Sequence, residues 1–170
     1  MKTGVAGLAL AAALAGQAAA DPFEDFGTAM KYGLPLAAAV CAADQDRLED
    51  FAVRGLIQVI VVRGLKRWFD GTPIGTRPPR ATEVGRGFPS GHTAAATFGA
   101  ADLAGKCFPD DVAAGAATYG AAGLTGASRI HAGQHTAQQV WAGALIGLSI
   151  GAADFGIGTE GMSFSVGMRF

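Results

Sequence analysis

The sequence predicts an all-α fold, a compact bundle of about five or six helices in a single domain. Three observations support this fold class. The chain has 170 residues, which suits one hydrophobic core. Half of the residues are apolar, and they fall into five segments that can form helices. Alanine is abundant and there are 26 glycines, and such small residues let helices approach one another closely.

The first twenty residues have the order of a secretory signal peptide. Lys2 precedes an apolar run over residues 5–15, and Ala18 and Ala20 supply small residues at a cleavage point. This order predicts cleavage after Ala20 and export of residues 21–170. An uncleaved membrane anchor is the alternative. We therefore expect a periplasmic or membrane-associated protein.

We expect five helices, separated in the middle of the chain by one long loop. The second helix has the clearest pattern, with a broad apolar face, whereas Gly33 and Pro35 interrupt the first. The loop, residues 70–90, is rich in Gly, Pro and Arg, and a loop of this length in a compact domain is usually functional or disordered. The predicted helices cover residues 26–43, 47–68, 91–106, 111–127 and 136–154.

None of these helices looks like a typical bilayer span, because each is short or is interrupted by charges such as Arg54 and Arg63. Faces rich in small residues pack closely in lipid as well as in water. Because a signal peptide precedes the helices, we favour a soluble or surface-associated bundle and keep a membrane-embedded one as the alternative.

The C-terminal residues, GMSFSVGMRF, follow a different period. Met162, Phe164, Val166, Met168 and Phe170 alternate with small or polar residues, which is typical of a strand. We expect an edge strand, or a strand that pairs with another chain.

Two cysteines, Cys41 and Cys107, would meet an oxidising compartment after export. A disulfide and two isolated buried thiols are both compatible with the sequence. Neither cysteine has a neighbour that indicates thiol catalysis.

Positive charge is concentrated in one part of the chain. Removal of residues 1–20, which contain one basic residue and no acidic one, leaves 12 basic and 14 acidic residues. Six of the 12 lie within residues 63–86, where only Asp70 and Glu83 oppose them. Such a field suits an anionic ligand, and a solvated basic loop is the alternative. No pattern typical of nucleic-acid binding is present.

Three stretches at predicted helix boundaries carry the chemistry: LKRWFDGTPIGTRPPR, GFPSGHTAAA and GASRIHAGQHTAQQV. They supply cations, a hydroxyl, two histidines and the free backbone amides of a helix start, which bind anions. Phosphoryl transfer needs such a set, because cations and amides neutralise the phosphoryl oxygens while imidazoles attack phosphorus and protonate the leaving oxygen. The polar residues are Lys66, Arg77, Ser90, His92, Ser128, Arg129 and His135.

Together these stretches resemble the signature of the type 2 phosphatidic acid phosphatase superfamily: Lys-x6-Arg-Pro, then Pro-Ser-Gly-His, then Ser-Arg-x5-His-x3-Asp. This superfamily also contains bacterial acid phosphatases and vanadium haloperoxidases. Residues 89–92 match the second element in full, Arg77-Pro78 match the first in part, and Ser128-Arg129-x5-His135 match most of the third. The resemblance implies a helical bundle with the phosphate site at one end, working without a metal or another cofactor.

By position, the resemblance makes His135 the nucleophile that forms a phosphohistidine, and His92 the general acid for the leaving group. The implied phosphate-binding residues are Lys66, Arg77, Ser90, Gly91 and Arg129.

The sequence departs from this signature at two places. Ten residues rather than six separate Lys66 from Arg77. Lys66 could still reach the site if the extra residues bulge outward, and Arg67 or Arg80 could replace it. The second departure is Gln139, which stands where the superfamily has Asp.

Gln139 has two interpretations. Thr136 and Gln139 have the spacing of a capping box, in which Gln139 would bind the Thr136 amide and not touch His135. Alternatively, its amide oxygen accepts a hydrogen bond from Nδ1–H of His135 and orients the ring. An amide cannot offset positive charge on that ring, so we expect reduced activity rather than none.

The expected function is therefore an exported phosphatase acting on a phosphomonoester or pyrophosphate, including a lipid phosphate. A catalytically weak protein that binds phosphate or a phosphorylated headgroup is the alternative, and a vanadium haloperoxidase is a distant one. His131 and His135 have the spacing of a zinc pair, but no glutamate accompanies them, so we expect no metal and take His131 as a bystander.

Overall fold

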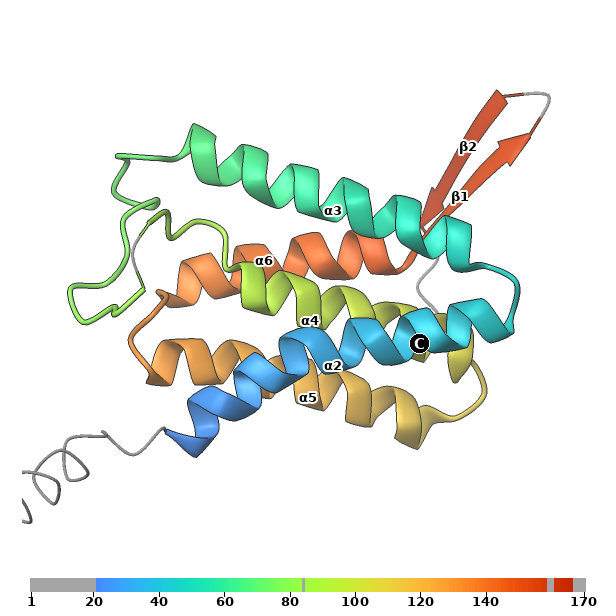
Figure 1. Cartoon of the computed structure of the whole chain (residues 1–170), viewed down its shortest axis with the longest axis horizontal. Coiled ribbons are helices and arrows are strands. Elements are labelled where there is room, and N and C mark those ends of the chain that lie inside the picture. The colour runs from blue at the N-terminus through green and yellow to red at the C-terminus, as the bar shows by residue number, and fades with distance from the viewer. Residues whose placement is uncertain (1–20, 84, 159–160, 167–170) are drawn as a thin grey trace, which may run out of the picture.

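The structure of the chain is a computed structural model that describes residues 21–83, 85–158 and 161–166. The predicted signal peptide and residues 167–170 of the predicted tail strand lie outside them. The expected all-α bundle is confirmed, with a C-terminal β-hairpin added to it (Figure 1). The elements are α2 (Pro22–Asp44), α3 (Leu48–Trp68), α4 (Gly91–Asp102), the π-helical turn η1 (Leu103–Cys107), α5 (Val112–His131), α6 (Ala137–Gly151), β1 (Ala153–Gly158) and β2 (Gly161–Val166).

Two predicted helix ends were wrong. The fourth predicted helix, α5, continues to His131 and stops before Gly133, whose φ of 66° is the left-handed conformation with which glycine ends helices. The Ser128-Arg129 pair is therefore helical. The fifth, α6, ends at Gly151 rather than residue 154, because Ala153 begins β1.

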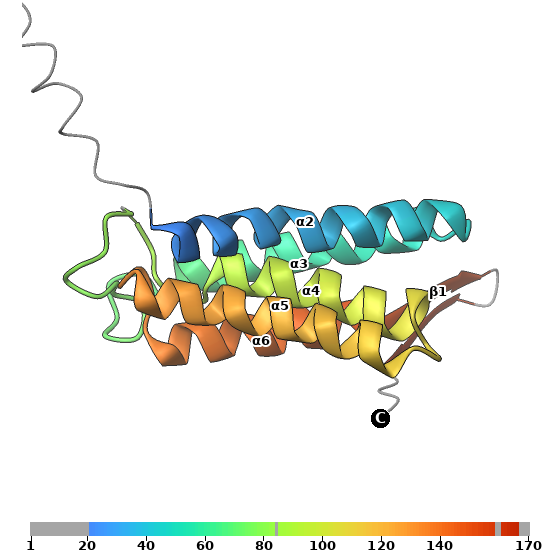
Figure 2. The ribbon, with the colours of Figure 1, turned by 90° about the horizontal axis from the view of Figure 1, so that it is seen from below.

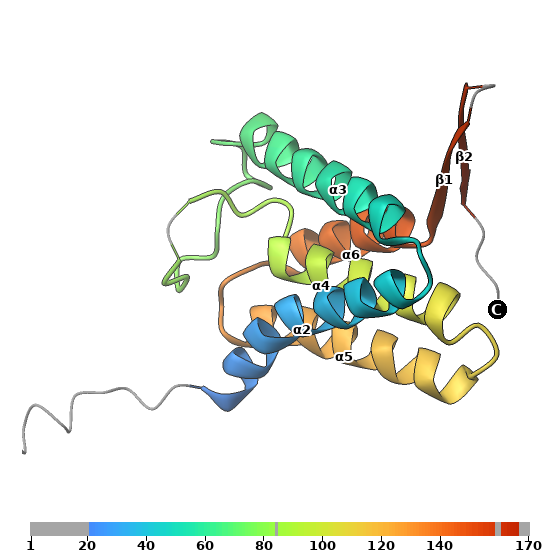
Figure 3. The same cartoon turned by 45° about the vertical axis from the view of Figure 1, so that its right-hand side comes forward.

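Helix α4 forms the centre of the bundle, packed by α2, α5 and α6 (Figures 1, 2 and 3). From Thr93 to Asp102 all its residues but one are buried. Most of these residues are alanine, glycine or threonine, so the core is made by closely spaced backbones more than by large side chains. Phe98 is the largest apolar side chain of α4, and its ring packs against that of Phe51 of α3, tilted by 44° at 5.1 Å between ring centroids.

Three glycines of α6, four residues apart, face the backbone of α4. A Cβ atom at Gly143, Gly147 or Gly151 would lie 2.4, 2.3 or 2.5 Å from a carbonyl oxygen of α4 or its N-cap. These distances are shorter than any real Cβ contact, so only glycine permits this separation of the two helices. The stripe therefore fixes how α6 lies along α4.

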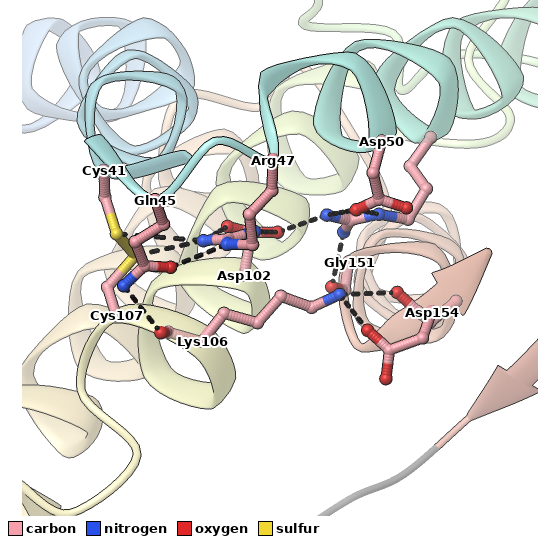
Figure 4. A network of polar contacts seen from close by, with 11 residues as sticks. Cys41, Gln45, Arg47, Asp50, Asp102, Lys106, Cys107, Gly151 and Asp154 are labelled. Carbon is pink, nitrogen blue, oxygen red and sulfur yellow. Dashed lines mark hydrogen bonds and ion pairs between the residues drawn. A yellow bond between two sulfur atoms is a disulfide. The ribbon is translucent and has the colours of Figure 1, made fainter. Parts of the chain in front are cut away.

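At the end of the bundle that carries the hairpin, a buried ion-pair network joins three helices (Figure 4). Arg54 of α3, which is 0% exposed, contacts Asp102 of α4 and Asp50 at 2.6 Å each. Its guanidinium also donates to the Gly151 carbonyl of α6 at 2.9 Å. Because removal of one partner would leave a buried charge unpaired, the network specifies how α3, α4 and α6 meet.

A disulfide between Cys41 and Cys107 joins α2 to η1 at this same end (Figure 4). Of the two alternatives left open by the sequence, the structure thus has the disulfide. Arg47 lies against it and pairs with Asp102 at 3.3 Å, which connects the disulfide to the ion-pair network.

The predicted tail strand is present as β2, and its partner lies in the same chain. β2 pairs antiparallel with β1, in a register that matches Ala153 with Val166 and Gly158 with Gly161. The expectation of an edge strand is confirmed, since β2 has a neighbour on one side only within the described sheet, and that neighbour is β1 of the same chain. Among the described residues, no helix combines the length and the apolarity needed to cross a membrane.

The glycine stripe gives a first prediction. Gly147→Ala places a methyl group 2.3 Å from the Ala94 carbonyl oxygen and 2.8 Å from the Phe98 amide nitrogen, so the two helices must separate. We expect unfolding by urea to show a loss of about 1–3 kcal/mol. Gly123→Ala on α5 is the matched control, since nothing lies within 4 Å of its Cβ position. It should be neutral or stabilising by about 0.5–1 kcal/mol, and equal losses in both variants would contradict the argument.

Candidate active site

The end of α3, the start of α4, the α5–α6 turn and the long loop meet at the end of the bundle opposite the ion-pair network (Figures 1 and 3). They surround a cavity of about 390 Å³. Five of the residues expected in the site line this cavity, together with residues of α2 and α3 that the sequence did not indicate. The five are Lys66, Arg77, Gly91, His92 and His135, and the additional polar ones are Lys31, Gln58, Arg63 and Glu83.

The other three expected residues lie behind this lining. Ser90 and Gln139 are 0% exposed and Arg129 is 1% exposed. Ser90 is the N-cap of α4, where its Oγ accepts from the Thr93 amide at 3.4 Å. Arg129 donates to the Glu24 carbonyl of α2 at 2.7 Å. The structure thus brings together all of the expected residues, but in two layers.

The ring of His135 is held in one orientation and one tautomer. Its Nδ1 lies 3.0 Å from Oε1 of Gln139, and because a carbonyl-type oxygen only accepts, Nδ1 must carry the proton. The Nε2 atom then keeps its lone pair, which accepts a hydrogen bond from the Arg77 guanidinium at 3.4 Å. A neutral imidazole with Nε2 unprotonated is the form that can attack phosphorus.

Gln139 fulfils both of its proposed roles. Its side-chain Oε1 accepts from the backbone N–H of Thr136 at 3.2 Å as well as from His135. The Thr136 hydroxyl in turn accepts from the backbone N–H of Gln139 at 3.3 Å, which completes the capping box. The two interpretations offered by the sequence are therefore not alternatives.

The nitrogen of the Gln139 amide explains why an amide, and not a carboxylate, suits this position. Nε2 donates to the carbonyls of Ile74 and Thr76 at 2.9 and 2.8 Å. Both carbonyls lie in the stretch between Lys66 and Arg77, which is longer than in the superfamily signature. At these two residues the stretch contacts Gln139 instead of bulging outward. A carboxylate has no proton to donate there. Gly87 closes over the amide, and a Cβ atom at this position would lie 2.6 Å from Nε2.

A second buried amide, Gln134, holds the loop on the other side of His135. Its Nε2 donates to the Thr82 hydroxyl at 2.6 Å, and its Oε1 accepts from the Glu83 amide at 3.1 Å. Its backbone carbonyl accepts from Arg77 at 2.9 Å. Two glutamines that flank the histidine in sequence thus attach the loop at two points.

Glu83 provides a carboxylate inside the cavity. It pairs with Arg77 at 2.9 Å and lies 3.9 Å from Arg129. Burial raises the pKa of this carboxyl group, but the cations around it, Arg77 first, outweigh that effect and hold the pKa below its usual value. Glu83 is therefore ionised at neutral pH, in contact with an arginine expected to bind phosphate.

The two histidines are both uncharged at neutral pH. Burial is the largest cause that lowers the pKa of His92 to about 4, followed by the charges of Lys31 and Arg129. Burial likewise lowers the pKa of His135 to about 4, against the effect of the hydrogen bond that His135 donates to Gln139, and Arg77 contributes in the same direction as burial. An anion in the cavity would raise both values, because it favours the charged imidazolium.

Lys66 reaches the cavity despite the longer spacing, and neither Arg67 nor Arg80 replaces it there. Its Nζ donates to the Arg86 carbonyl at 2.8 Å. Burial, and then the charge of Arg77, lower its pKa to about 8. The start of α4 adds anion donors, since the first amides of a helix have no intrahelical partner.

His131 contacts Asp21 at 2.9 Å and does not line the cavity. Within the described ranges, no three His, Cys, Asp or Glu side chains are grouped so that they could hold a metal ion.

Fold and cavity together define a helical bundle with a cationic, histidine-containing anion site at one end. The chain belongs to the PAP2 superfamily, whose family model matches residues 53–157. The structure is also similar to LpxE of Aquifex aeolicus, with a TM-score of 0.61 and 25% identity over 81% of this chain and 88% of that one. Comparison with curated protein sequences gave no match. The resemblance inferred from the three stretches is confirmed.

The Gln139 contacts give a second prediction. Gln139→Glu keeps the length of the side chain but replaces the donor to two carbonyls with an oxygen that repels them. We expect a loss of about 2–4 kcal/mol in urea unfolding and faster proteolysis within residues 70–90. Gln138→Glu, an exposed neighbour in the same helical turn, is the control for charge and should leave both measurements unchanged. A stable Gln139→Glu protein with a protected loop would refute the role of Nε2.

The lowered pKa of Lys66 gives a third prediction. The ammonium is charged below pH about 8 and neutral above it, so inorganic phosphate should bind several-fold more weakly at pH 9.5 than at pH 7. Inorganic phosphate is only partly a dianion at pH 7 and gains negative charge toward pH 9.5, which by itself would strengthen binding, so a loss of affinity must come from the protein. Lys66→Arg keeps its charge throughout and should remove this loss in calorimetric titrations. If both proteins lose affinity equally, another group is responsible.

Proposed function

We propose that the protein is a phosphatase that hydrolyses a phosphomonoester or a pyrophosphate through a phosphohistidine at His135. The observation that carries this proposal is the His135 ring. Nδ1–H is fixed on Gln139, and the Nε2 lone pair faces a cavity that it shares with Arg77, Lys66 and His92.

In the first step, Nε2 of His135 attacks phosphorus and the bond to the leaving oxygen breaks. His92 donates its proton to that oxygen, so the alcohol leaves uncharged. In the second step, His92 takes a proton from a water molecule, whose oxygen attacks the phosphohistidine. The P–N bond breaks, its electron pair returns to Nε2, and inorganic phosphate is released.

His92 must be protonated for the first step, although burial lowers its pKa to about 4. The bound phosphate dianion raises this pKa, and mildly acidic conditions help. Below pH about 4, however, His135 is protonated as well and loses its lone pair. We therefore propose an acidic pH optimum, with kcat/KM falling on both sides of it.

The neutral Gln139 does not offset the positive charge that His135 acquires, and Glu83 is the carboxylate available to do so. The Coulombic effect of Glu83 raises the pKa of both His135 and His92, which means that it stabilises their charged forms. Phosphate would take over the contact of Glu83 with Arg77, and the carboxylate would then face the histidines.

The leaving group would lie along α3. Val59, Val62 and Ala95 form an apolar wall of the cavity, and large apolar side chains such as Leu36 of α2 and Leu56 of α3 are exposed nearby. These features support an alcohol with an apolar body, such as a lipid. The disulfide supports export to an oxidising compartment, in agreement with a periplasmic or membrane-associated location.

A second candidate function is binding of a phosphorylated headgroup with little turnover. Two observations favour it: Gln139 is neutral, and Glu83 pairs with the arginine that phosphate needs. This binding function would use the same cavity as the phosphatase function and would differ from it only in the rate of hydrolysis.

The test is phosphate release by purified residues 21–170 from p-nitrophenyl phosphate and from a short-chain phosphatidic acid, with vanadate as inhibitor. His135→Ala should abolish turnover of both. His92→Ala should cost about 10²–10⁴-fold in the first turnover of the lipid and much less for p-nitrophenyl phosphate, whose leaving group departs without a proton. A folded protein that binds vanadate but releases no phosphate would favour the binding function.

A further inference from the structure

A second cavity of about 460 Å³ lies beside the candidate active site, between the last turns of α3 and the end of the loop. It shares Arg63 and Lys66 with the first cavity, so the two are neighbours. Four of the six residues that line it are cationic. The six are Arg63, Lys66, Arg67, Asp70, Gly85 and Arg86.

The cations converge from two segments. Arg63, Lys66 and Arg67 have the i, i+3, i+4 spacing that places them on one face of α3. Arg86 comes from the far end of the loop, and its carbonyl accepts from Lys66 at 2.8 Å. Because two separate segments supply the charges, a basic helix surface alone does not account for them.

Acidic residues do not balance this charge. Asp70 is the single carboxylate in the lining, and it pairs with Arg86 at 2.6 Å. Arg63 and Arg67 have no ion-pair partner in the described part of the chain. The carbonyl groups at the C-terminus of α3 favour nearby cations only weakly at a surface, so an anion between these groups would relieve their repulsion.

The geometry points to a second anion subsite in this cavity, which binds another phosphate of the same substrate while the first phosphate lies near His135. This inference rests on the proposed phosphatase function. Lys66, which lines both cavities, would contact both phosphates. The preferred substrate would then be a diphosphate ester, or a phosphate ester with a second phosphate close by, rather than an isolated phosphomonoester.

The test compares calorimetric titrations of purified residues 21–170 with inorganic phosphate and with imidodiphosphate, a diphosphate analogue that resists hydrolysis. We expect imidodiphosphate to bind at least about tenfold more tightly, since its second phosphoryl group adds charge-assisted hydrogen bonds. Arg67→Gln should remove most of this advantage and change phosphate binding less than about twofold. Asp70→Asn should strengthen imidodiphosphate binding, because it removes the opposing carboxylate.

Arg80→Gln is the matched control. Arg80 is an exposed arginine of the same loop and lines neither cavity, so its loss should reduce the imidodiphosphate advantage far less than that of Arg67. If both variants lose the imidodiphosphate advantage equally, net charge alone explains it and the inference is overturned. Equal affinity of the wild type for the two anions would also overturn it.

Turnover separates this inference from the proposed function. A protein that hydrolyses monoesters but binds both anions equally has the proposed function without the second subsite. A protein that hydrolyses nothing but loses its diphosphate preference in Arg67→Gln has the subsite without the function.

Discussion

The contact between α4 and α6 is the constraint on which the rest of the structure depends. Three glycines of α6, which have no side chain, let its backbone contact the backbone of α4. They are Gly143, Gly147 and Gly151. The first contact of this stripe reaches Ser90, whose amide also donates to the Gln139 carbonyl at 2.9 Å. The start of α4, with His92, is therefore placed against the start of α6, beside His135. At the opposite end, the buried Arg54–Asp102 pair joins α3 to the same two helices. The candidate active site and the buried ion-pair network thus lie at opposite ends of the α4–α6 pair.

The second organising feature is the pair of amides that flank His135. Gln134 and Gln139 are both buried, and each binds the loop through its nitrogen. Amides do not titrate, so these attachments are the same at every pH at which the fold is stable. The charged groups Lys66 and Glu83 also contact the loop, through the Arg86 carbonyl and Arg77, but a change in their charge leaves the amide contacts in place. The orientation of the His135 ring therefore depends on groups that do not titrate.

Much of the fold could be predicted from the sequence because helical periodicity and motif spacing are local signals. The α3 pattern and the three site stretches are of this kind. The end of α5 was missed because Ser128 and Arg129 were interpreted as a loop motif, whereas both are buried helical residues. The partner of β2 was missed because residues 153–154 were assigned to the end of the helix that becomes α6, whereas β1 begins at Ala153. Lys31 and Glu83 were missed for another reason: each is a single residue without a pattern, and only tertiary packing brings it to the cavity. Gln134 precedes His135 directly in the chain, but nothing in the sequence shows that its side chain binds Thr82 and Glu83 of the loop.

The bonds between Gln139 and the loop also limit how such a chain could change. Shortening the stretch between Lys66 and Arg77 to six residues would remove or displace the carbonyls of Ile74 and Thr76 and leave the buried N–H₂ group of Gln139 without these acceptors. Replacing Gln139 by aspartate alone would leave two partly buried carbonyls without a donor. Either change alone, the shorter loop or the substitution of Gln139, would therefore give a less stable protein. Only both changes together avoid unpaired hydrogen-bonding groups. The length of the loop and the identity of residue 139 are thus structurally coupled. A variant with aspartate at position 139 would also need a shorter loop.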